Sequence, residues 1–213
     1  MEFSEKFEFH ISFFLSFSFS KSNGEDPYFH FYHFPKKPFV SFAGWCCANN
    51  LLINPDKTKL VLFGTRQLVL KLPDVTVSFL GQQLCPVLSA KDLGVTLDSG
   101  LTFNNHISSL SSSLLSSLCQ ISRVHHLFSK EVLYITINSV VFSKLFYCSA
   151  VWAGTYKQNI YKLQLMQNFA SRILTDTGKY DHITPALKAL GWQTTEEQIW
   201  SRDVTMVYKF VND

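Results

Sequence analysis

The chain has 213 residues, of which 46% are hydrophobic and 16% charged, and its formal net charge is +3. The length suits one or two small domains, and no run of about 18 uncharged apolar residues predicts a transmembrane helix. So small a net charge does not by itself indicate nucleic-acid binding. Five cysteines at irregular spacing exclude a zinc ribbon and argue against a disulfide framework, which predicts reduced, mostly buried thiols in a cytosolic or nuclear protein.

Residues 1–42 differ in composition from the rest of the chain. They hold 12 of the 20 phenylalanines, and phenylalanine and serine alternate over residues 17–20 with the period of a strand. A secretory signal needs a basic segment before its apolar run, whereas three glutamates precede this one. A low-complexity segment, such as a translated pyrimidine tract, is the favoured alternative. Residues 21–42 resemble a loop or linker, and we expect the whole of 1–42 to be disordered.

Residues 43–100 predict one helix followed by a small antiparallel sheet. Apolar residues lie on one helical face from Trp45 to Ile53, and the Pro55 that follows ends this helix. Short apolar or alternating segments then predict strands, with a turn at residues 81–83. The predicted strands are Lys57–Phe63, Val75–Leu80 and Leu93–Leu97, and Gly94 within the last suggests close approach by another backbone.

Residues 101–213 change to a helical period. Apolar residues recur at intervals of three and four residues from Phe103 to His125, which predicts a helix whose polar face is rich in serine. Four more segments read as helices, and together with the strands they predict an α+β fold. These are a buried helix over 130–149, an amphipathic helix over 156–174, a short helix opening at Thr184–Pro185 beyond a loop over 178–182, and a last helix over 194–210.

The common catalytic motifs are absent. The sequence contains no P-loop, dinucleotide-binding fingerprint, nucleophile elbow or zinc-protease motif. Asp181–His182 resembles a base with its orienting carboxylate, but no nucleophile stands near it in sequence. The sequence therefore predicts no catalytic residue, no metal site, no cofactor and no small-molecule substrate.

Six ordered motifs resemble the reverse transcriptases of LINE-type (non-LTR) retrotransposons. They begin with W-C-C-A-N-N-L-L-I-N-P-D-K-T-K-L-V-L-F-G at Trp45 and L-G-V-T-L-D at Leu93. F-N-N-H-I follows at Phe103. S-K-L-F-Y-C begins at Ser143 and is followed by V-W at Val151. L-Q-L-M-Q-N-F-A-S-R-I at Leu163 and D-H-I-T-P at Asp181 complete the series. The resemblance implies a partial palm with a primer-grip-like hairpin over 43–100 and a helical, thumb-like region over 101–213. Residues 1–42 show no such resemblance.

The family's polymerase chemistry needs two Mg²⁺ ions held by carboxylates, among them an Asp-Asp pair before the Trp-containing helix. This sequence contains no Asp-Asp, so the resemblance predicts a truncated polymerase remnant that does not polymerise alone. Two alternatives are a residual module that binds a template–primer duplex weakly, and a secreted or membrane-associated helical protein, although we expect no membrane partner.

The resemblance also implies roles for single residues. It places Leu93, Gly94 and Val95 at the primer grip, where a core strand is an equal alternative, and Lys57 near the leaving pyrophosphate, where a solvated lysine is the simpler interpretation. The candidate phosphate contacts on the thumb-like helices are Lys144, Lys157, Lys162, Arg172 and Lys179.

Overall fold

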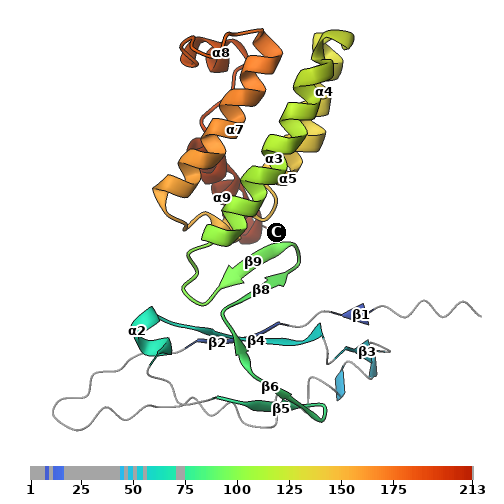
Figure 1. Cartoon of the computed structure of the whole chain (residues 1–213), viewed down its shortest axis with the longest axis vertical. Helices are drawn as coiled ribbons and strands as arrows, with labels where there is room; N and C mark the ends of the chain where they lie inside the picture. The colour runs from blue at the N-terminus through green and yellow to red at the C-terminus, as the bar shows by residue number, and fades with distance from the viewer. Residues whose placement is uncertain are drawn as a thin grey trace, which may run out of the picture. The chain divides into compact units, whose positions relative to one another are not determined.

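The computed structural model of the chain describes residues 8–9, 12–16, 44–45, 48–49, 52–54, 57–70 and 75–212. Its contacts divide the chain into two units, Met1–Leu101 and Thr102–Asp213. The first unit consists mainly of strands and the second of helices, as Figure 1 shows. This is the mixed α+β class that the sequence predicts.

The largest sheet of the first unit is parallel, which corrects the antiparallel prediction for its central strand. β4 (Lys59–Phe63) pairs in parallel with β2 (Ser12–Ser16) on one side and with β7 (Pro86–Val87) on the other. A second parallel pair joins β1 (Glu8–Phe9) to β3 (Leu52–Ile53). The apolar residues of β4 run continuously rather than alternating, and all of Leu60–Leu62 are buried. A continuous apolar run is typical of a parallel strand covered on both faces.

Two antiparallel hairpins complete the strands of this unit among the described residues. β5 (Val77–Phe79) pairs with β6 (Gln82–Leu84), and β8 (Ser89–Asp92) pairs with β9 (Val95–Asp98). Each hairpin turns through a Leu-Gly pair with positive φ at both residues, as two-residue type I′ turns require. Phe79 and Leu84 pack with Leu60 and Leu62 to form a small core.

The hairpin geometry corrects two predictions. The strand predicted to begin at Leu93 begins at Val95, because Leu93 and Gly94 form the turn, at φ 42° and 87°. Near the start, Asn49 N donates to Trp45 O at 3.1 Å in a helical turn, but the predicted helix does not continue to Ile53, which lies in β3. A four-residue helix, α2 (Arg66–Val69), follows β4 and was not predicted. The alternation at residues 17–20 lies outside the described residues.

The second unit is built around two long helices, which confirm the periodicity predicted for them. α3 (Asn104–Val124) and α7 (Lys157–Thr175) pack against each other and run side by side in Figure 1. Their buried side chains are apolar residues at helical spacing, with a few polar ones. Those fully buried on the two helices include Ile107, Leu114, Leu118, Leu163, Gln167 and Ala170.

The predicted helix over 130–149 is interrupted. α4 (Lys130–Ile137) continues as a π-helical turn (Asn138–Phe142), then as α5 (Ser143–Leu145), and the chain turns before α6 (Ser149–Trp152). The prediction that this segment is buried is also wrong in part. Leu133, Ile137, Val141 and Leu145 lie in the core, whereas Ile135 on the other face of α4 is 66% exposed.

Two further helices follow α7, as predicted. α8 (Thr184–Ala189) has proline in its first turn. Backbone N–H groups in a first turn have no acceptor within the helix, so proline breaks no hydrogen bond there. α9 (Thr195–Asn212) begins with a capping box, in which Thr194 N donates to Glu197 Oε2 at 2.8 Å and Glu197 N donates to Thr194 Oγ1 at 3.3 Å. A short 3₁₀ turn (His125–Leu127) ends α3.

Two further findings concern the residues that the structure describes. None of their helices is long and apolar enough to cross a membrane. The described cysteines Cys85, Cys119 and Cys148 are free thiols, and the first two are exposed. The prediction of mostly buried thiols is therefore wrong for these two.

Candidate nucleic-acid interface

The pair α3 and α7 presents a surface without carboxylates. Neither helix contains a single aspartate or glutamate along its whole length, and α3 carries eight serines among its 21 residues. The exposed polar residues of α3 recur at spacings that place them on one side of the helix. This serine face consists of Asn104, Asn105, Ser108, Ser109, Ser112, Ser113, Ser116, Gln120 and Arg123.

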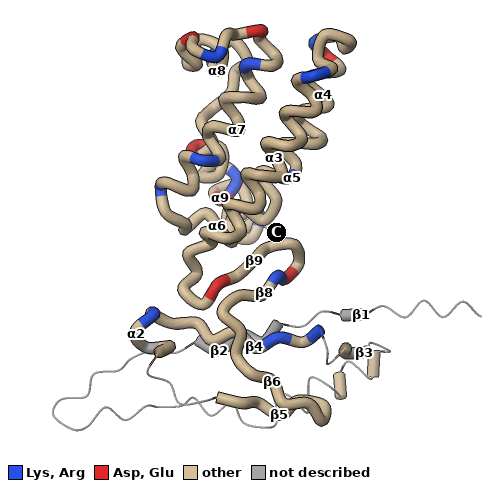
Figure 2. Tube along the Cα trace, in the orientation of Figure 1, with Lys and Arg blue, Asp and Glu red and all other residues tan. Residues whose placement is uncertain are grey.

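Such a face suits a polyanion. Hydroxyl and amide side chains donate to phosphate oxygens, and their small size lets a nucleic-acid backbone approach the helix closely. The absence of carboxylates from the two helices removes the charge repulsion that a phosphate backbone would otherwise meet. Figure 2 shows where the charged residues lie along the trace.

A buried amide joins the beginnings of α3 and α7. Asn159 is 2% exposed, and its Nδ2 donates to Asn104 Oδ1 at 2.7 Å and to Thr155 Oγ1 at 2.8 Å. Thr155 Oγ1 in turn donates to the carbonyl of Thr102 at 2.7 Å. These contacts fix the two helix starts against each other, so the serine face keeps a defined position relative to α7.

The predicted lysine contacts fall into two groups. Lys157 is exposed at the first turn of α7, and the half-buried Lys162 lies beyond it on the same helix, where its Nζ donates to Asn159 Oδ1 at 3.4 Å. Lys144 is exposed on α5, and Lys179 is exposed in the loop after α7. The structure therefore brings Lys157 and Lys162 to one helix and leaves the other two on separate elements.

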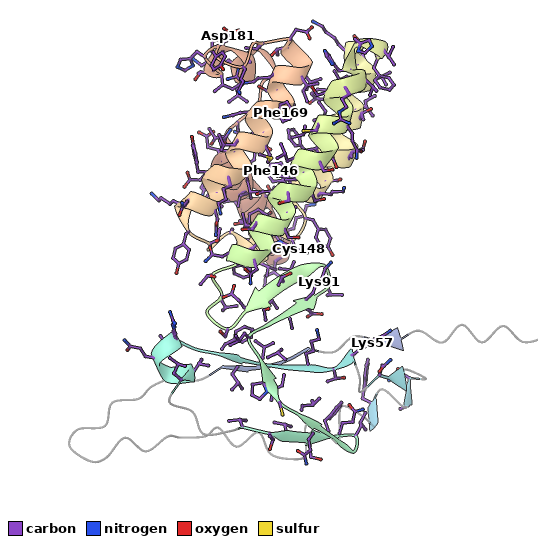
Figure 3. The ribbon with its side chains drawn as sticks, viewed as in Figure 1. Lys57, Lys91, Phe146, Cys148, Phe169 and Asp181 are labelled. Atoms are coloured by element: carbon purple, nitrogen blue, oxygen red, sulfur yellow. The ribbon has the colours of Figure 1, made fainter. Side chains whose placement is uncertain are left out.

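Arg172 has a structural role in this unit. Its Nη1 donates to the carbonyl of Gly178, and its Nη2 donates to the carbonyl of Asp181 at 2.8 Å. Gly178 N closes the same loop by donating to Asp181 Oδ2 at 2.8 Å. Figure 3 labels Asp181 in this loop, next to α8. Arg172 thus holds the loop between α7 and α8 in one conformation.

The residues assigned by resemblance in the first unit lie at two different places. Leu93 and Gly94 form the tip of the β8–β9 hairpin, where Leu93 is 81% exposed, and Val95 is buried at the start of β9. Lys57 is exposed between β3 and β4, and its backbone N donates to the carbonyl of Asn54 at 3.3 Å. The structure therefore places the primer-grip-like residues and Lys57 on separate elements.

The motif residues of the second unit contact one another across the fold. The rings of His106 and Trp152 lie 6.3 Å apart, and Trp152 Nε1 donates to the carbonyl of Tyr147 at 3.0 Å. A hydrogen bond with the Cys148 thiol raises the pKa of Tyr147 above its usual range. The motifs at Phe103 and Ser143 therefore meet in the helical core.

The amides of the motif on α7 form a second network. Gln167 is fully buried, its Nε2 donates to the carbonyl of Gln193 at 2.8 Å, and its Oε1 accepts from Thr195 Oγ1 at 2.9 Å. Gln164 Oε1 accepts from Thr195 N at 2.7 Å, and Gln164 Nε2 donates to Asn168 Oδ1 at 2.8 Å. This network ties α7 to the beginning of α9. The motif amides on α7 therefore stabilise the fold.

Sequence reasoning missed the serine face as a site. The sequence predicts these serines only as the polar face of a packed helix, although the absence of carboxylates from the helix is visible in it. Among the described residues, no group of three or more His, Cys, Asp or Glu side chains is arranged to hold a metal ion.

Comparison with known proteins supports the resemblance to reverse transcriptases. The chain is 28% identical over 166 residues to a probable RNA-directed DNA polymerase from the transposon BS of Drosophila melanogaster. The match covers 75% of this chain but only 18% of that polymerase. No family model matches the chain, and no solved structure matches it. The similarity confirms that the chain carries a region like a non-LTR reverse transcriptase.

Proposed function

We propose that the helical unit Thr102–Asp213 binds a nucleic-acid duplex along α3 and α7, within a protein of reverse transcriptase origin. The single observation that carries this proposal is the serine face, a surface of α3 free of carboxylates, on a helix that packs against α7, which carries basic residues and no acidic ones. The similarity to a transposon RNA-directed DNA polymerase supports it, because that protein's name describes an enzyme that acts on nucleic acid.

Phosphate contacts would come from two kinds of side chain. Lys157 and Lys162 supply positive charge from α7, and the serine hydroxyls supply neutral donors from α3. Such contacts position a duplex without reading its sequence. Few cations are involved, so we expect weak binding. Its salt dependence should be modest, because log K falls against log salt with a slope of about −0.9 for each phosphate neutralised on DNA.

We further propose that this 213-residue polypeptide does not polymerise nucleotides by itself. Phosphoryl transfer to a primer end depends on carboxylates that hold two divalent cations, and the sequence contains no adjacent aspartates. Primer extension with Mg²⁺ and all four deoxynucleotides tests this directly. We expect no extended product, and extension by the purified chain would overturn this part of the proposal.

Duplex binding is tested by inserting charge into the serine face. Ser109→Glu and Ser113→Glu add a carboxylate at two exposed positions of α3, and Ser201→Glu adds the same charge at an exposed position of α9. Fluorescence anisotropy with a blunt RNA–DNA duplex measures affinity at several salt concentrations. We expect the two α3 variants to bind more weakly than Ser201→Glu. Equal affinities in all three, or binding that does not change with salt, would refute the assignment.

A further inference from the structure

The loop between α7 and α8 presents an exposed aromatic ring on a braced backbone. Tyr180 is 93% exposed, although a phenol ring normally buries much of its apolar surface. The Nζ of Lys179 lies 5.6 Å from the centre of the Tyr180 ring, so a cation stands beside the exposed aromatic.

The loop that carries this ring is fixed at both ends. Arg172 donates to the carbonyls of Gly178 and Asp181, and the Asp181 carboxylate accepts from Gly178 N. A Cβ at position 178 would lie 2.8 Å from Asp181 Oδ2, so a side chain there would displace this carboxylate from its present position. The exposed position of Tyr180 is therefore set by a hydrogen-bonded turn, and ligand binding has little ordering cost to overcome.

Two basic side chains, Arg172 and Lys179, lie at this loop. Lys179 also borders an open hollow of about 380 Å³, to which Arg172 and His125 contribute. The two carboxylates nearby have partners, since Asp181 accepts from Gly178 and Asp176 Oδ1 lies 3.6 Å from His125 Nε2. The charge that lies over the tyrosine ring is the ammonium of Lys179, 5.6 Å from the ring centre.

We propose that Tyr180 is a stacking site for an unpaired base of single-stranded nucleic acid, with Lys179 contacting the adjacent phosphate. A base within a duplex has both faces covered, whereas an unpaired base can stack on an aromatic side chain. The inference rests on the proposed function and adds to it, because it gives the single strand that extends from a bound duplex a contact of its own.

The test compares two ligands on the full chain by fluorescence anisotropy. One is a blunt duplex, and the other is the same duplex with a single-stranded oligothymidine extension. We expect the extension to tighten binding by about fivefold to a hundredfold, as stacking of one base does. Tyr180→Ala should abolish this gain without changing affinity for the blunt duplex, and Tyr180→Phe should retain it.

Tyr208→Ala is the matched control, since Tyr208 is an exposed tyrosine on α9. Lys179→Gln should weaken the gain and reduce its salt dependence. If the blunt duplex binds but Tyr180→Ala leaves the gain unchanged, the stacking site is wrong and the proposed function stands. If neither ligand binds, both proposals are wrong. Loss of binding to phosphatidylserine vesicles in Tyr180→Ala, with unchanged oligonucleotide binding, would assign the loop to a membrane surface and overturn the inference.

Discussion

Replacement of Gln167 by leucine tests whether the amide network holds α9 to α7. Gln167 is fully buried and bonds to both the carbonyl of Gln193 and the hydroxyl of Thr195. In Gln167→Leu the carbonyl of Gln193 keeps a hydrogen-bond donor, because Gln198 Nε2 donates to it at 3.1 Å. The buried hydroxyl of Thr195 loses its acceptor, which costs about 1–3 kcal/mol. The lost bond to the carbonyl adds about 0.5–1.5 kcal/mol, and the apolar leucine side chain offsets part of the sum.

We therefore expect Gln167→Leu to lower the free energy of unfolding by about 2 kcal/mol. Urea unfolding of the full chain, followed by the helical circular dichroism signal, measures this loss. The urea midpoint should fall by about 1 M, given slopes of about 1–3 kcal/mol per molar urea. Gln158→Leu makes the same change at an exposed position of α7 and should alter stability by less than about 0.5 kcal/mol.

A double variant isolates the hydrogen bond from the packing. Thr195→Val alone leaves the Gln167 amide oxygen with one donor fewer. The double variant Gln167→Leu, Thr195→Val removes both the hydroxyl donor and the amide acceptor of this hydrogen bond, so neither group is left without the other. Removal of both partners of a buried bond costs less than the two single losses added together. The reasoning is refuted if Gln167→Leu unfolds at the same urea concentration as Gln158→Leu, or if the double variant loses the full sum.

Three other changes have defined outcomes. Leu93→Asn should stabilise the first unit by about 1 kcal/mol in urea unfolding, because asparagine tolerates positive φ better than leucine; an unchanged or lower midpoint would contradict this. Arg172→Ala should speed tryptic cleavage at Lys179, since the loop loses two hydrogen bonds, and equal cleavage rates would argue against the brace. Hydrogen bonds from the backbone and side chain of Thr194 hold the pKa of Glu197 below its usual 4.5. The capping contribution is thus complete above pH 4.5 and is lost as the pH falls through the lower folded-state pKa, and Glu197→Gln should flatten this part of the stability profile measured by thermal unfolding.

The long helices were predictable because their packing follows one period. The apolar residues of α3 and α7 recur at three and four over about five turns, and the structure buries that face. The interruption after Ile137 was not visible, because apolar residues occupy both faces of that segment and no single periodicity marks the π turn. The segment consequently looked buried on all sides.

In the strand-containing unit, hydrophobic periodicity locates a strand but does not predict which strands pair with it. β4 was located correctly, but its direction of pairing depends on β2 and β7, which lie far from it in sequence. The continuous apolar run Leu60–Phe63 indicated burial on both faces and could have suggested a parallel sheet. At the β8–β9 turn, leucine stands where asparagine or glycine is usual, so local sequence gave no sign of the type I′ turn before Gly94.

Apart from Asn104 and Asn105, the motifs and the proposed interface lie on different residues, and this separation has a physical cause. Gln167, Trp152 and Arg172 each satisfy buried or backbone polar groups, so their replacement would disturb the fold whatever the ligand. A phosphate backbone instead needs an exposed surface of donors without carboxylates, a condition that many sequences meet. Resemblance by motif therefore reports the fold, and the binding function must be tested on the serine face and at Tyr180, where substitution leaves the core intact.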